Sequence, residues 1–158
     1  MSVKVKLSDI VEAMELQSPM HSHHIDLQTG EIHMLSKEEF EAAESEDPLE
    51  DSPDWQQPLI EKAREILEDI DKQRYLTLPT QFDIHEWSIM RDFALSFSDE
   101  NQREALLDAI HGSGAFRRFK EAIRRLGLIE KWHAFKDARL REIARNWCKR
   151  HGISYVEE

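Results

Sequence analysis

Four potential metal ligands lie close together in the sequence, on either side of one predicted turn. They are His24, Asp26, Glu31 and His33. Imidazole nitrogens and carboxylate oxygens bind zinc and similar ions. The segment 23–35 is therefore a candidate metal site, and a metal-dependent enzyme is one functional hypothesis. The competing interpretation is a polar, solvent-exposed face whose side chains only titrate, because the spacing lacks the helical His-Glu-x-x-His pattern of zinc enzymes.

A β-hairpin must position these four residues. Gly30 supplies the left-handed backbone conformation that the turn needs, and the side chain of Asp26 can accept hydrogen bonds from turn amides. A four-residue loop places His24 opposite His33, and Asp26 opposite Glu31, on the non-apolar face. Loops of two or four residues both gather three apolar side chains on the other face, namely Ile25, Ile32 and Met34. We therefore expect an even loop.

A second group of side chains is basic and falls on one predicted helix. It comprises Arg117, Arg118, Lys120, Arg124 and Arg125, and the helix after it adds further lysines and arginines up to residue 150. Arginine binds phosphate and carboxylate groups through its planar fork of donors. Phe116 and Phe119 lie among these cations at the spacing of a helix core, so we expect both rings to be buried rather than stacked on bases.

Charge is divided unevenly along the chain of net charge −11. Residues 1–112 carry 9 Lys and Arg against 26 Asp and Glu, whereas residues 113–156 carry 12 against 4. This asymmetry predicts an anionic partner, or docking between the two halves of the chain. The strongly negative total opposes non-specific binding to DNA unless the acidic half faces away.

These patterns favour a non-enzymatic interaction or regulatory module that binds a macromolecule through the basic helices of residues 113–150. A protein partner or self-association is the first interpretation, and nucleic acid is an alternative. A third interpretation is that the basic surface pairs with the protein's own acidic stretch, Glu38 to Asp54, or is merely solvated.

Several function classes find no support in the sequence. We identify no catalytic residue and no cofactor motif. Cys148 is the only cysteine, which excludes an internal disulfide, and we expect it to be a small helical residue of no special reactivity. No run of about 18 apolar residues occurs, and the N-terminal segment lacks the apolar stretch of a secretory signal. We therefore expect a cytoplasmic protein without a membrane partner.

The predicted fold is a single, mainly helical α+β domain spanning residues 1–158. A small, largely antiparallel sheet is expected to pack against five or six helices. The hairpin forms its centre, and the candidate further strands are Val3–Leu7, Arg74–Leu78 and Ile153–Val156. Residues 44–57 are rich in acids and proline and predict a loop or mobile linker within the domain, which we expect Trp55 to anchor.

Arg139 raises a separate question, because it lies near the predicted inward stripe of the last helix, between Phe135 and Ile143. A buried guanidinium requires a carboxylate partner. Either an acidic side chain reaches Arg139, or this position lies at the edge of the stripe.

Several segments resemble one bacterial family. The most specific is Gly-Ser-Gly-Ala-Phe-Arg-Arg-Phe-Lys at residues 112–120, and Trp-His-Ala-Phe at 132–135 and Ile-Ala-Arg-Asn-Trp at 143–147 follow it in order. The Asp-x-x-Thr-Gly-Glu hairpin at residues 26–31 also matches. The chain thus resembles Uncharacterised Protein Family 0158. The resemblance implies a bacterial source and one compact domain, and it brings no activity, cofactor or site residue with it.

Overall fold

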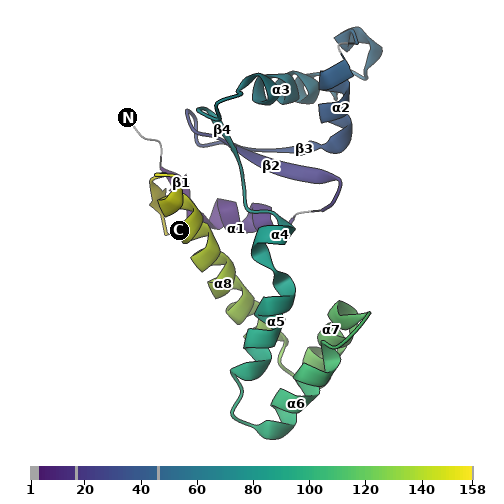
Figure 1. Ribbon diagram of the computed structural model, residues 1–158, viewed down its shortest axis with the longest axis vertical. Helices are drawn as coiled ribbons and strands as arrows, with labels where there is room; N and C mark the ends of the chain where they lie inside the picture. The colour runs from purple at the N-terminus through teal and green to yellow at the C-terminus, as the bar shows by residue number, and fades with distance from the viewer. Residues whose placement is uncertain (1–3, 17, 46, 158) are drawn as a thin grey trace. The chain divides into compact units, whose positions relative to one another are not determined.

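The computed structural model describes residues 4–16, 18–45 and 47–157 (Figure 1). The protein is mainly helical with two small sheets, one of them antiparallel with three strands, which confirms the predicted α+β class. The chain divides into two compact units. Unit 1 comprises residues 1–80 and 144–158, and unit 2 comprises residues 81–143. The organisation as one domain stays a prediction.

Unit 1 contains a three-stranded sheet with helices on both faces of the sheet. The elements of unit 1 are β1 (Val5–Lys6), α1 (Leu7–Glu15), β2 (His21–Asp26), β3 (Ile32–Ser36), α2 (Lys37–Ser45), the 3-10 helix η1 (Leu49–Asp51), α3 (Gln57–Glu68), β4 (Tyr75–Thr77) and β5 (Tyr155–Val156). The long helix α8 (Ile129–Arg150) begins in unit 2 and ends in unit 1.

The sheet has the strand order β3-β2-β4, with both pairs antiparallel. His24 pairs with His33, and the amide of Asp26 donates to the carbonyl oxygen of Glu31 at 2.8 Å. The loop therefore has four residues, which confirms the expected even loop, and Gly30 closes it with a φ of 81°. The predicted strand at residues 74–78 is confirmed, because β4 pairs with the other edge of β2.

Helices cover both faces of this sheet: α1 lies on one side, and α2 and α3 lie on the other (Figure 1). The face that carries His24 and Asp26 is buried, with 6% and 1% of these residues exposed. The interpretation of this face as a polar surface open to solvent is therefore wrong. Polar residues tolerate burial here because neighbouring side chains satisfy them.

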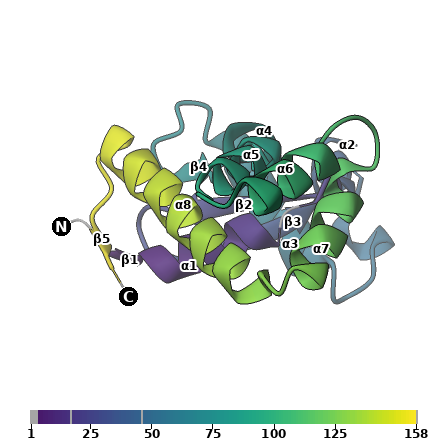
Figure 2. The same cartoon turned by 90° about the horizontal axis from the view of Figure 1, so that it is seen from below.

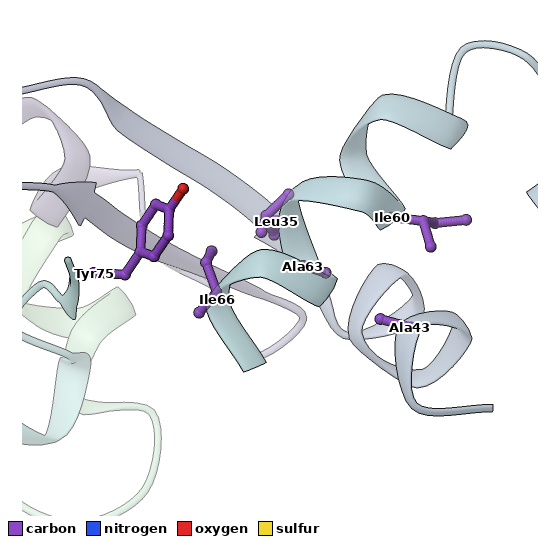
Figure 3. Close-up of a cluster of buried hydrophobic side chains, with 6 residues drawn as sticks. All are labelled: Leu35, Ala43, Ile60, Ala63, Ile66 and Tyr75. Atoms are coloured by element: carbon purple, nitrogen blue, oxygen red, sulfur yellow. The ribbon is translucent and has the colours of Figure 1, made fainter. Parts of the chain in front are cut away.

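The core on the α2–α3 side is built by the periodicity of α3. Apolar residues at positions 60, 63 and 66 lie on one face of that helix and meet β3, β4 and α2 (Figure 3). The buried cluster comprises Leu35, Ala43, Ile60, Ala63, Ile66 and Tyr75. At the start of α2, Ser36 and Glu39 exchange hydrogen bonds in a capping box, in which the Glu39 amide donates to the Ser36 hydroxyl at 3.3 Å.

The acidic connection before α3 is anchored differently from the prediction. Trp55 is 69% exposed, so the expectation that it anchors this loop is wrong. Gln56 is the buried residue, and its amide donates to a carboxylate oxygen of Glu39 at 2.9 Å. A buried hydrogen bond to a carboxylate thus replaces the expected apolar contact, and hydropathy alone does not reveal it.

The first and last strands form a separate sheet. β1 and β5 are parallel, with Val5 opposite Tyr155, and they lie side by side near the end of α8 (Figure 2). The expectation that both strands extend the hairpin sheet is wrong. Each has only two residues, and α1 begins directly after β1, so neither strand is long enough for its sequence to specify a partner.

Unit 2 is helical and packs around aromatic rings. Its elements are α4 (Gln81–Ile84), α5 (Glu86–Leu95), α6 (Glu100–Ala109), α7 (Ala115–Arg125) and the first part of α8. Phe93 lies at the centre and makes edge contacts, at ring distances of 5.0–6.2 Å, with Phe97, Phe119, Trp132 and Phe135. Across the described residues, every helix is too short or too polar to cross a membrane.

Candidate functional site

His24 is held inside the fold by groups of its own chain. Its Nε2 lies 2.7 Å from the hydroxyl oxygen of Ser22, and its Nδ1 lies 3.2 Å from that of Thr77. The ring also makes an edge contact with Phe40 at 5.3 Å. Burial is the main cause that lowers the pKa of His24 to about 4, so the imidazole is neutral at pH 7. Both of its nitrogens are already hydrogen-bonded.

Asp26 forms an ion pair with Arg74, the residue that directly precedes β4. Arg74 donates to the two carboxylate oxygens through Nε at 3.2 Å and Nη2 at 2.9 Å, and the amide of Gln28 donates at 2.9 Å. Burial alone raises the pKa of Asp26, but these hydrogen bonds outweigh it and hold the pKa below its ordinary value. The carboxylate therefore stays ionised and fixes the hairpin to β4.

Glu31 and His33 complete the predicted metal ligands. Nε2 of His33 lies 3.7 Å from a carboxylate oxygen of Glu31. The structure thus brings all four candidates onto one hairpin, with two of them already engaged by other side chains. Within the described parts of the chain, no group of three or more His, Cys, Asp and Glu side chains could hold a metal ion.

The second candidate, α7, has one apolar and one basic side. Ala115, Phe119, Ala122 and Ile123 are buried, whereas Arg117, Lys120, Arg124 and Arg125 are exposed. The period of 3.6 residues places positions 117, 120 and 124 together on the outer side. We call Phe116, Arg117, Lys120 and Arg124 the α7 basic face. Two glycines with positive φ, Gly112 and Gly114, form the turn that precedes it.

Arg118 differs from the other predicted contact residues of α7. Its guanidinium donates to the carbonyl oxygen of Ala109 at 3.1 Å and also to those of His111 and Ser113. These carbonyls belong to the end of α6 and the turn after it, where helical partners are lacking. Arg118 therefore stabilises the α6–α7 connection, and its donors are used within the fold.

The cations of the α7 basic face have no such partners within unit 2. Among the residues of unit 2 that the structure describes, no carboxylate forms an ion pair with Arg117, Lys120 or Arg124, or with Arg125 beside them. Their donor groups are exposed to solvent and are not used within unit 2. A carboxylate or phosphate of another molecule can therefore bind them directly.

Most cations along the middle of α8 are engaged instead. Their ion pairs have N–O distances of 2.7–3.0 Å and join Lys136 to Glu86, Arg139 to Asp92, Arg141 to Asp137, and Arg145 to Glu157. Both alternatives considered for Arg139 hold in part, because Asp92 reaches its guanidinium and the side chain is 34% exposed. The sequence treats α7 and α8 as one basic surface, whereas the structure separates a free group of cations from a paired one.

Phe116 is a site residue that sequence reasoning assigns wrongly. It is 48% exposed, whereas Phe119 is fully buried as predicted. Ala115 occupies the inward position in its place, and this puts Phe116 at the edge of the apolar stripe, next to Lys120 one turn later. The sequence does contain a signal for this. Around the helix, position 116 lies to one side of the buried stripe formed by positions 115, 119 and 122.

Cys148 is buried, in agreement with the prediction that it has no special reactivity. Burial raises the pKa of its thiol to about 11, so the reactive thiolate is scarce at neutral pH.

Comparison with known proteins identifies a family, but the family is described as uncharacterised. The model of the uncharacterised protein family UPF0158 matches residues 5–158. A UPF0158 protein of Pseudomonas aeruginosa is 24% identical over 142 residues, which cover 89% of this chain and 80% of that relative. No solved structure matches the chain.

Proposed function

This chain belongs to the uncharacterised protein family UPF0158, and we propose that it is a non-enzymatic interaction module that binds an acidic protein surface through the α7 basic face. The observation that carries the proposal is the set of exposed cations at positions 117, 120 and 124. Among the described residues of unit 2 they have no ion-pair partner, while most cations along the middle of α8 have one.

The exposed ring of Phe116 favours a protein partner over nucleic acid. Aromatic and arginine side chains are enriched where protein interfaces derive most of their binding free energy, and α7 exposes both types, in Phe116 and Arg117. Net charge also supports this choice, because a chain of net charge −11 repels a long nucleic acid more strongly than it repels a small acidic patch.

The proposal is tested by charge reversal with a matched control. The test variant is Arg117→Glu, Lys120→Glu and Arg124→Glu. The control variant is Lys131→Glu, Lys149→Glu and Arg150→Glu, which makes the same change in net charge at exposed positions of α8. The probes are a fluorescently labelled glutamate oligomer and a single-stranded RNA of equal charge, each titrated by fluorescence anisotropy.

We expect the wild type and the control variant to bind the glutamate oligomer. We expect the test variant to lose about 100-fold in affinity, or about 2.7 kcal/mol, with an unchanged circular dichroism spectrum and unfolding midpoint. Equal losses in both variants would show that only net charge matters. Tighter binding of RNA through the same three residues would replace the acidic protein with nucleic acid. A rise in mass with protein concentration that the test variant abolishes would make the partner a second copy of the chain.

A further inference from the structure

An open pocket of about 630 Å³ lies in unit 1, between α1 and the β2–β3 hairpin. Asp9, Glu12 and Ala13 line it from α1, and the turn residues Thr29 to Glu31 line it from the hairpin. The volume falls in the range typical of small-ligand sites. It belongs to the α1 side of the sheet, away from the α2–α3 core.

The carboxylates at this pocket are not balanced by lysine or arginine. Three carboxylates line it, those of Asp9, Glu12 and Glu31, and no lysine or arginine is among the lining residues. Carboxylates grouped in a concave site raise the local concentration of cations. The carboxylates alone do not define a ligand, because acidic side chains are common on the surface of this chain.

The imidazole of His23 supplies the independent evidence for a ligand. His23 lines the pocket and is only 5% exposed, and its Nδ1 has no hydrogen-bond partner within the described structure. His33 also lines the pocket, but its Nε2 lies 3.7 Å from a carboxylate oxygen of Glu31, so the ring does not serve as a second free acceptor. A buried ring nitrogen without a partner carries a free-energy cost, which a bound donor would remove.

Burial is the main cause that lowers the pKa of His23, so its ring is neutral near pH 7 and offers one acceptor nitrogen. An ammonium group can donate to such a nitrogen and to carboxylates at the same time. Leu16 and Met34 line the same pocket and are 61% and 51% exposed, which gives a carbon chain an apolar surface to pack against.

We propose that this pocket binds a small organic cation, an alkyl amine or polyamine, with its ammonium groups against Glu12, Glu31 and His23 and its carbon chain against Leu16 and Met34. A bare metal ion fits less well, because no group of three or more ligand side chains in the described residues could hold one. The site is independent of the α7 basic face and takes a ligand of the opposite charge.

The test is calorimetric titration of the full chain with spermidine at physiological ionic strength. Glu12→Gln combined with Glu31→Gln should weaken spermidine binding at least tenfold. Glu15→Gln removes one carboxylate on the same helix but outside the pocket, and this control should change the affinity less than twofold. The charge-reversed α7 variant should bind spermidine as the wild type does. In a ¹H–¹⁵N spectrum, the ring nitrogens of His23 should shift on binding.

Three results would overturn the proposal. One is an equal loss in the Glu15→Gln control, and another is full competition by magnesium at equal ionic strength, because both indicate simple counter-ion attraction. The third is an unchanged His23 ring at saturating spermidine. A neutral diol of the same chain length should not bind. If Nα-acetyl-lysine amide, which keeps its side-chain ammonium group, binds as tightly as spermidine, the ammonium group that fits the site is that of a protein side chain rather than of a free polyamine.

Discussion

The β2–β3 hairpin and α7 carry the two groups of polar side chains that stand out in the sequence, and the fold uses them in opposite ways. In the hairpin, His24 and Asp26 are buried and hydrogen-bonded to Ser22, Thr77 and Arg74. On α7, the cations at positions 117, 120 and 124 are exposed, and no ion pair engages them among the described residues of unit 2. Substitution should therefore cost stability in the hairpin and binding on α7.

The largest expected effect is the acid sensitivity that His24 confers. Its pKa is lowered from 6.5 in the unfolded chain to about 4 in the fold, so the unfolded state binds the proton more readily between these values. Its contribution to stability is complete above pH 6.5 and is lost as the pH falls towards 4, by at most about 3 kcal/mol. Urea unfolding of the wild type and of His24→Gln at pH 7.5 and pH 4.5 measures it. An identical loss of unfolding free energy in the two proteins between pH 7.5 and pH 4.5 would contradict this assignment. The α7 variants should lose as much unfolding free energy as the wild type does.

The next effect concerns Asp26, whose carboxylate is almost fully buried against a partly exposed Arg74. Asp26→Asn should lower the free energy of unfolding by about 2 kcal/mol at pH 7, because the guanidinium loses its charged partner. A double-mutant cycle with Arg74→Gln should show that most of this loss is shared between the two residues. Additive losses would mean that the ion pair does not couple the hairpin to β4.

Two neighbouring arginines on α7 allow a sharper comparison on one helix. Arg118→Gln should lower the free energy of unfolding by about 1 kcal/mol, because carbonyl groups at the end of α6 lose their donor. Arg117→Gln should leave stability unchanged and weaken binding of the glutamate oligomer. Equal effects of the two substitutions on stability would remove the distinction between structural and free cations.

The smallest effect is expected on α8. The Arg139–Asp92 ion pair is about one-third exposed on both sides, so Arg139→Gln should cost only about 0.5 kcal/mol of stability. Binding of the glutamate oligomer should not change, since this guanidinium already has a partner. A marked loss of binding in this variant would extend the interaction surface from α7 to α8.

Local patterns predicted much of the fold. The hairpin register followed from the alternation around Ile25 and the conformation that Gly30 allows, and α3 followed from its apolar period. The pairing of β1 with β5 could not be predicted, because two-residue strands carry no pattern that specifies a partner. Burial of the His24 face was also hidden, since its partners Thr77 and Arg74 are about 50 residues away in sequence.

The candidate sites show the same limit. The sequence identified the cations of α7 and α8, but it could not separate free from paired ones, because pairs such as Arg139 with Asp92 form between helices distant in sequence. It also missed the pocket beside α1, which depends on a buried His23 whose neighbours belong to another element. Partners and exposure decide what a polar residue does, and both are properties of the tertiary structure.

The most direct test of the α7 basic face is the salt dependence of glutamate-oligomer binding as its cations are removed one at a time. Arg117→Gln, Lys120→Gln and Arg124→Gln should each weaken the affinity and flatten its dependence on salt, while the free energy of unfolding stays that of the wild type. Lys136→Gln, which removes a paired cation, should leave both the affinity and its salt dependence unchanged. If Lys136→Gln weakens binding as much as Arg117→Gln does, free and paired cations are equivalent, and α7 is not the binding surface.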